Sequence, residues 1–406
     1  MTRAAGERGN HRGAWGNQGD CENRGDCGRQ GDYGHRGGCG RQGGSGNRGG
    51  WGSRGDWAEL LRISALFTVP GDALAGAAAV GRGPNRGTAL AVCASLCLYE
   101  AGMALNDWAD RDIDAIERPG RPLPSGRIAP AAALAAATGL TAAGLACAAA
   151  AGRPALATAT ALAGTVWAYD LGLKNTLAGP PTMAATRALD LLLGAAATAP
   201  TAPRPAAVGS AGGAPRLAAV RTTPAALRPA AVASAPSTPR PAGVRSALRP
   251  ALRPAVLLGA HTLAVTEVSR REAVGGSSAA PLAALAVGTA IAWTATRRPS
   301  RSANPAARRP APDVGAGHRT RPVSRVAAVA GAVLAGGYAA TIARPLAHAA
   351  LNPSPYLLQR AVGSGIRAVI PLQAVLASRA GAHRTAAGLL ALMPVARRLS
   401  RKVSAT

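Results

Sequence analysis

Long apolar blocks dominate the chain from about residue 60 onward, and short polar stretches separate most of them. A helix needs about 20 mainly apolar residues to span the hydrocarbon core of a bilayer. The blocks that approach this length, several of them rich in alanine, are 60–80, 88–106, 130–151, 154–173, 182–199, 254–267, 279–296, 323–343 and 361–378. The pattern predicts an all-α protein, a polytopic membrane bundle of about nine transmembrane helices.

The remaining segments differ sharply from these blocks in composition. Residues 1–57 form a Gly/Arg-rich tail that has too little apolar surface to order itself. Residues 200–253 and 297–322 are rich in Pro, Ala and Arg, and recurrent prolines argue against a continuous helix. We therefore expect a disordered tail, a membrane domain over 58–380 interrupted by two disordered insertions, and a short basic C-terminal segment at 381–406.

The amino-acid composition supports a membrane protein more than a nucleic-acid-binding protein. Apolar residues make up 48% of the chain but aromatic residues only 3%, and the abundant Ala and Gly are typical of helices that pack closely in membranes. The net charge of +27 is a feature of nucleic-acid-binding proteins. It lies mainly in the segments predicted to be disordered, so we expect membrane lipids and no nucleic acid as partners. RNA binding by the Arg-Gly tail remains the weakest alternative.

A cluster of carboxylates closes the second apolar block. In the stretch 106–114, Asp107, Asp110 and Asp114 are spaced i, i+3, i+7 and would share one face of a continuing helix. Like charges at this spacing repel one another, more strongly where the dielectric is low. A divalent cation removes the repulsion, and Mg²⁺ binds through one or two carboxylates plus substrate phosphates. The spacing therefore predicts a Mg²⁺ site at the membrane edge.

The loop that follows supplies arginines to the same place. Residues 118–128 contain prolines and glycines that end the helix and bring Arg118 and Arg121 over the acidic face. Because guanidinium groups suit bidentate capture of phosphate, the two motifs together indicate a diphosphate clamp. Glu100 lies one heptad before Asp107, where it would either line a cavity or pair with an arginine of another helix.

The combined pattern of these two stretches is Asn-Asp-x-x-Asp-x-x-x-Asp followed by Arg-x-x-Arg-Pro-Leu-x-Ser-Gly-x-Ile. It resembles the first signature of the UbiA superfamily of intramembrane prenyltransferases (4-hydroxybenzoate polyprenyltransferase-like), in an actinobacterial-type branch. The resemblance implies a bundle of nine helices that uses Mg²⁺ to activate a prenyl diphosphate. It covers roughly residues 58–380 apart from the two insertions.

A second polar motif, Tyr169 to Thr176, follows two blocks later and should emerge on the same side of the membrane. Asp170 and Lys174 are i, i+4 neighbours, which alone would indicate an ordinary ion pair. The resemblance implies that a second acidic motif stands here and binds a further Mg²⁺. This chain has a single aspartate in it, so Asp170 is the predicted ligand and Lys174 is expected to supply charge to the diphosphate.

Three further features carry weaker signals. Arg187 is a candidate contact to phosphate or acceptor, with a mutual pair between Arg187 and Asp190 as the alternative. Asp72 lies inside an apolar run, where an ionisable residue is costly. The loop 267–272 occupies the position that, by the resemblance, covers the active site.

These observations predict an integral membrane prenyltransferase that transfers a prenyl group to an aromatic or lipid-like acceptor. Mg²⁺ would be held by four carboxylates, and the diphosphate by Lys174, Arg118 and Arg121, with Asn106 and Tyr169 positioning either partner. The active site is expected to face the cytoplasm from the cell membrane. The alternative is a membrane carrier that binds a prenyl or amphipathic metabolite on the same fold without catalysis. The four predicted Mg²⁺ ligands are Asp107, Asp110, Asp114 and Asp170.

Overall fold

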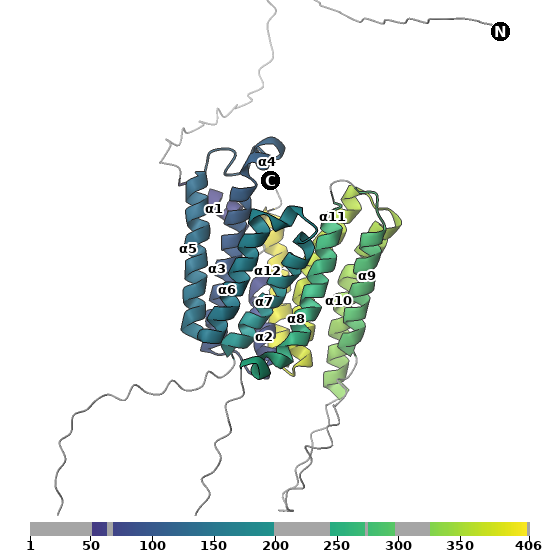
Figure 1. The fold of residues 1–406 in the computed structure, drawn as a ribbon. Coiled ribbons are helices and arrows are strands. Elements are labelled where there is room, and N and C mark those ends of the chain that lie inside the picture. Colours follow the sequence, from purple (N-terminus) through teal and green to yellow (C-terminus); the bar gives the residue numbers. More distant parts are fainter. Residues whose placement is uncertain (1–50, 63–67, 199–243, 273–274, 297–324, 404–406) are drawn as a thin grey trace, which may run out of the picture. The chain divides into compact units, whose positions relative to one another are not determined.

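The computed structural model of the chain describes residues 51–62, 68–198, 244–272, 275–296 and 325–403, which are almost entirely helical (Figure 1). Within these ranges the only extended pairing is a single bridge between Trp51 and Ile128, so the prediction of an all-α fold is confirmed. The helices are α1 (Arg54–Leu60), α2 (Val69–Ala79), α3 (Arg86–Ala109), α4 (Arg111–Glu117), α5 (Pro130–Ala151), α6 (Arg153–Leu171), the 3₁₀ turn η2 (Leu173–Asn175), α7 (Gly179–Thr198), α8 (Val244–Ser269), α9 (Ala279–Thr296), α10 (Arg325–Leu351), α11 (Pro355–Arg379) and α12 (His383–Val403).

Five helices are long and apolar enough to cross a membrane, namely α3, α5, α9, α11 and the part of α10 from Val329. The helices α6, α7 and α8 have 19, 20 and 26 residues, but they do not meet the same criterion. The block expected at 60–80 is divided between α1 and the 11-residue α2. The described residues therefore support a polytopic membrane bundle without confirming the count of nine spans.

The prediction that residues 1–57 are disordered is wrong for the last seven of them. Residues 51–57 are described, and α1 begins at Arg54 behind a capping box in which Ser53 and Asp56 satisfy each other's backbone N–H groups. Trp57 adds a hydrogen bond of 2.6 Å from its ring nitrogen to the carbonyl of Trp51. Local capping and a docked aromatic ring order this stretch in spite of its glycines. Residues 1–50 lie outside the described part of the chain.

The predicted insertion 200–253 is also too long, because α8 already begins at Val244 and includes Pro250 and Pro254. Each proline removes one hydrogen bond from the helix, but α8 packs along α7, and such tertiary contacts override local propensity. Both residues 199–243 and residues 297–324 lie outside the described ranges, so disorder there stays a prediction. The C-terminal segment is mostly a helix, α12, which packs against α11 and α2.

Small residues bring the helices close together, as the composition suggested. A Cβ atom on Gly76 of α2 would collide with the carbonyl oxygen of Leu191 in α7. One on Gly194 of α7 would collide with the backbone of Ala73 in α2. The two helices thus cross at backbone contact, as small-residue interfaces in membrane bundles allow. This crossing fixes Asp72 of α2 and Arg187 of α7 as neighbours.

Three polar loops meet at one end of the bundle. Lys174 in η2 forms an ion pair with Asp110 at the end of α3. Arg270, just after α8, donates a hydrogen bond of 2.5 Å to the carbonyl of Thr176. The loops expected on one side of the membrane near 107–129, 170–180 and 267–278 therefore lie together.

Candidate active site

The first motif lies at the junction between α3 and α4. Asp110 ends α3 and begins α4, with a φ of −90° and a ψ of 0° that bend the chain between the two helices. Backbone hydrogen bonds continue across the junction, from the Asp110 N–H to the Asn106 carbonyl at 2.9 Å and from the Asp114 N–H to the Asp110 carbonyl at 2.8 Å. The helix therefore bends without unwinding, and the helical spacing of the three aspartates is kept.

Asp107 and Asp114 face the same guanidinium group. The Nη1 atom of Arg121 lies 2.5 Å from Asp114 Oδ2 and 3.5 Å from Asp107 Oδ1. Asp107 also pairs with Arg62 at 3.0 Å, and Asp114 lies 3.8 Å from Arg118. Both aspartates are buried, with 5% and 3% of their surface exposed. The structure thus brings the predicted arginines over the predicted acids.

The second motif meets the first through Lys174. Its Nζ atom lies 2.6 Å from Asp110 Oδ1, and the Asn106 side-chain amide donates to the other oxygen of Asp110 at 3.1 Å. The ammonium group of Lys174 is close enough to Asp110 for an ion pair, but within the described part of the chain none of its N–H bonds is aligned for a hydrogen bond. Its N–H donors can therefore turn to a ligand oxygen. The packing of α3 against α6 creates this meeting of two segments far apart in the sequence.

The arginine-bearing loop is anchored to α1, a contact that sequence reasoning missed. Arg127 lies 2.5 Å from Asp56 Oδ1 and 3.0 Å from Glu59 Oε2, and it donates to the carbonyl of Gly120 at 2.7 Å. Hydrogen bonds from Ser53, and more weakly the hydrogen bond and charge of Arg127, lower the pKa of Asp56 below its ordinary value. The capping pattern Ser-x-x-Asp could have indicated α1 from the sequence alone.

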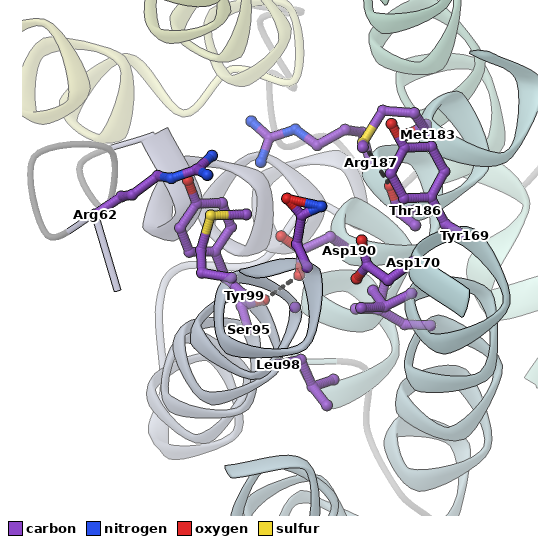
Figure 2. A pocket seen from close by; sticks show the side chains of 15 residues that line it. Arg62, Ser95, Leu98, Tyr99, Tyr169, Asp170, Met183, Thr186, Arg187 and Asp190 are labelled. Atoms are coloured by element: carbon purple, nitrogen blue, oxygen red, sulfur yellow. Dashed lines mark hydrogen bonds between the residues drawn. The ribbon is translucent and has the colours of Figure 1, made fainter. Parts of the chain in front are cut away.

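A cavity of about 280 Å³ opens beside the two motifs (Figure 2). Its walls are mainly apolar, which suits a hydrocarbon chain. Four predicted site residues, Asn106, Tyr169, Asp170 and Arg187, line it, whereas the other predicted residues lie outside the lining. The lining comprises Arg62, Ser95, Leu98, Tyr99, Gly102, Met103, Asn106, Leu162, Val166, Tyr169, Asp170, Met183, Thr186, Arg187 and Asp190.

Behind the cavity wall lies a buried polar network. Arg187 Nη1 forms an ion pair of 2.9 Å with Asp72 Oδ2, so among the described residues its ion-pair partner is Asp72 rather than the Asp190 of the sequence alternative. The side-chain amide of Gln373 in α11 donates to Asp72 Oδ1 at 2.7 Å, and the Ser95 hydroxyl donates to Asp190. No sequence signal pointed to Gln373, because its partner is distant along the chain.

Glu100 was expected either to line a cavity or to pair with an arginine of another helix, and among the described residues it does neither. It is buried, with 9% of its surface exposed, and it does not line the cavity. Its carboxylate oxygens have no hydrogen-bond partner among the described residues. We therefore assign it no part in the site.

The carboxylates suit a metal that takes most of its ligands from a substrate. Within the described ranges, no three Asp, Glu, His or Cys side chains converge as a metal cage would require. Mg²⁺ in phosphate-handling sites needs only one or two carboxylates, and phosphate oxygens and water complete its coordination. The buried Asp107 and Asp114, drawn to one guanidinium group, offer such a partial set.

Comparison with known proteins gives one broad match and several shorter ones. Residues 65–309 match the UbiA prenyltransferase family. A digeranylgeranylglyceryl phosphate synthase of Methanopyrus kandleri is 34% identical over 28% of this chain and 40% of its own length. A synthase of the same name from Ignicoccus hospitalis is 34% identical over 35% of this chain and 46% of its own length. The chain thus spans less than half the length of these curated relatives.

Among solved structures, a UbiA homolog from Aeropyrum pernix K1 has a TM-score of 0.45 at 16% identity and covers 74% of this chain and 96% of its own. The family match covers more than half of the chain and includes both polar motifs with the helices that carry them. The chain therefore belongs to the UbiA prenyltransferase family.

Proposed function

We propose that the protein transfers a prenyl group from a prenyl diphosphate to an acceptor within the membrane. The observation that carries this proposal is the ion pair between Lys174 and Asp110, which joins the two polar motifs beside an apolar cavity. Carboxylates, cationic side chains and an apolar cavity at one place are what the ionisation of a prenyl diphosphate requires. Membership of a prenyltransferase family supports the same conclusion.

The acids at the mouth of the cavity would hold the metal. We assign Asp107, Asp110 and Asp114 to Mg²⁺, with Asp170 as a further ligand from the cavity wall. When bound, Mg²⁺ would neutralise negative charge on the diphosphate and so make it a better leaving group.

The cationic side chains would stabilise the leaving group as its charge develops. Lys174 is 11% exposed and forms an ion pair with Asp110, and among the described residues its ammonium group has no aligned hydrogen bond. Arg121 and Arg118 lie over Asp114, from which their guanidinium groups can reach a phosphate oxygen. Such prearranged donors lower the barrier because they strengthen as the C–O bond breaks.

The cavity would hold the reacting ends of both substrates and keep water away. Asn106 and Tyr169 lie at the wall next to Asp110 and Asp170, where they would position the prenyl donor or its acceptor. The names of the curated relatives support a lipid-like acceptor, and an aromatic acceptor is the other candidate. We place the enzyme in the cell membrane with this end of the bundle facing the cytoplasm.

Replacement of Lys174 by alanine should lower the rate of pyrophosphate release by about 100-fold, since one prearranged donor to a developing anion is worth about 10²–10³ in rate. The measurement uses purified protein in nanodiscs, with Mg²⁺, geranyl, farnesyl and geranylgeranyl diphosphates, and mixed aromatic and lipid acceptors. Asp110→Ala should show a comparable loss, because it removes a metal ligand and the partner of Lys174.

Arg111→Ala is the matched control for that experiment. Arg111 is a cation of the same end of the bundle, but it pairs with the exposed Asp112 and stacks on Trp108. Its replacement should leave the rate within about twofold. Tight diphosphate binding without release by the wild type would favour the carrier alternative, and failure of folded protein to bind any diphosphate would refute the assignment of the site.

A further inference from the structure

Helix α11 carries two arginines on a face that the described part of the bundle leaves uncovered. Arg360 and Arg367 are both exposed, and their i, i+7 spacing puts them on the same face of the helix. Helix α11 is long and apolar enough to cross the membrane, and Arg367 lies at its midpoint. Because a charged side chain within a span is costly, such a residue indicates a functional site unless a partner compensates it.

The protein supplies no acid to compensate these two charges. Within the described ranges neither arginine forms an ion pair. The sequence contains no Asp or Glu after Asp313, so α10, α11 and α12 carry no negative side chain. Asp72 of the neighbouring α2 is fully buried and already pairs with Arg187. A compensating anion would therefore come from outside the protein.

Helix α12 brings further positive charge to the same face of α11. It follows α11 after a turn at Gly381, where φ is +82°, and its Ala386 and Leu389 join Ala374 and Ala377 of α11 in one apolar cluster. Helix α12 therefore runs back along α11. Because both helices rise by about 1.5 Å per residue, the last turns of α12 reach the level of the two arginines. Those turns contain Arg397, Arg398, Arg401 and Lys402.

Both guanidinium groups of α11 reach toward the start of the helix. That of Arg360 lies over the ring of Tyr356, 5.6 Å from its centroid. That of Arg367 lies beside Gly363, where an added Cβ atom would be 3.4 Å from Nη1. Long cationic side chains turn in this way toward the polar surface of a membrane while their stems stay on apolar surface. The two groups thus face the lipid headgroups from one stripe of the helix.

The start of α11 lies at the polar end of the bundle. The N–H of Gly276 donates to the carbonyl of Pro353 at 3.0 Å, which ties the start of α11 to the loop 267–278. Arg270 links that loop to the second polar motif. On the same face, beside Arg367, the apolar side chain of Ile366 is 52% exposed and can contact acyl chains. Cations near the surface with apolar surface next to them suit a lipid.

We propose that Arg360 and Arg367 bind the phosphate of an anionic membrane lipid, at a site completed by the basic end of α12. Charge complementarity supports this occupant. A headgroup with net negative charge removes the repulsion among the cations of the two helices, whereas a zwitterionic headgroup adds a cation of its own. Guanidinium groups suit phosphate because they donate two parallel hydrogen bonds. The bound lipid would hold the end of α12 against α11.

Native mass spectrometry of the delipidated full chain tests the site. The protein in detergent is titrated with phosphatidylglycerol and with phosphatidylcholine of identical acyl chains. The first phosphatidylglycerol should bind at least about tenfold more tightly than phosphatidylcholine, because two guanidinium groups meet a net negative charge. Equal binding of the two lipids would refute the proposal.

A double variant tests whether the two arginines are the cause. Arg360→Gln combined with Arg367→Gln should lower the preference for phosphatidylglycerol by at least about tenfold. The matched control is Arg82→Gln with Arg86→Gln, which removes two exposed arginines at the opposite end of α3 from the polar motifs and should keep the preference. An equal loss in both pairs would mean general attraction of a basic protein to anions and would overturn the site. If the first pair does not fold, Arg360→Lys with Arg367→Lys decides, since it keeps the charge and loses the paired hydrogen bonds, and an unchanged preference there would contradict the phosphate contact.

Inorganic phosphate separates a lipid from a soluble anion as the occupant. At millimolar concentration it should leave the bound phosphatidylglycerol in place, because it has no acyl chains to contact the exposed apolar surface. Displacement of the lipid would overturn its assignment. None of these measurements uses a prenyl diphosphate, so the lipid site and the proposed prenyl transfer can fail separately.

Discussion

Asp107→Asn is expected to reduce pyrophosphate release by at least about 1,000-fold at saturating prenyl diphosphate. The amide keeps the shape of the side chain but loses the charge that pairs with Arg62 and Arg121 and that is proposed to bind Mg²⁺. A metal contributes several kcal/mol to charge stabilisation in the transition state, and each 1.36 kcal/mol corresponds to about a factor of ten in rate. The rate is measured as a function of Mg²⁺ concentration in nanodiscs.

The Mg²⁺ dependence distinguishes a lost ligand from a damaged fold. A weaker metal site should need a higher Mg²⁺ concentration for half-maximal rate, whereas misfolding lowers the rate at every concentration. Asp112→Asn is the matched control, because Asp112 lies on α4 beside the motif, has a side chain that is 84% exposed, and among the described residues forms an ion pair only with Arg111. It should stay within about twofold of the wild type. A folded Asp107→Asn protein with wild-type kinetics would remove Asp107 from the site.

The parts of the site that the sequence predicted are those that depend on local spacing. The interval from Asp107 to Asp114 is two helical turns, and hydrogen bonds across the bend at Asp110 preserve it. The loop to Arg121 is short, which keeps its guanidinium group close to the same acids. Likewise the length and apolar composition of the blocks indicated helices, because these features depend on a window of residues and little on any single one.

The parts that the sequence could not predict depend on contacts between distant helices. Gln373 and Asp72 lie 301 positions apart, and no local pattern connects an amide in α11 with an acid in α2. The same holds for Arg187, for which Asp190 on its own helix was the visible partner and Asp72 the real one. The extension of α8 back to Val244 through two prolines is a further case, since packing against α7 outweighs local propensity there.

Gly194→Ala is expected to be strongly destabilising, although it adds only one methyl group. That group would meet the carbonyl oxygen, Cα and carbonyl carbon of Ala73 in α2, all closer than van der Waals contact allows. A side chain can rotate away from such a clash, but a helix backbone must move as a whole. Overpacking typically costs about 1–3 kcal/mol, and a backbone clash belongs at or above the upper end of that range. Unfolding is measured in nanodiscs by heat or denaturant.

The expected damage extends to the cavity, because Ala73 is the neighbour of Asp72. Movement of α2 away from α7 would lengthen the 2.9 Å ion pair from Asp72 to Arg187, so the wall of the cavity should be disturbed as well. Gly139→Ala is the matched control, since Gly139 lies in α5 and, beyond its chain neighbours and its own helix backbone, no atom of the described residues lies within 4 Å of the added methyl group. There alanine should be neutral or stabilising by up to about 1 kcal/mol, through its higher helix propensity. Equal stability of the two variants would mean that α2 and α7 do not cross at backbone contact, and the neutralisation of Arg187 by Asp72 would lose its structural basis.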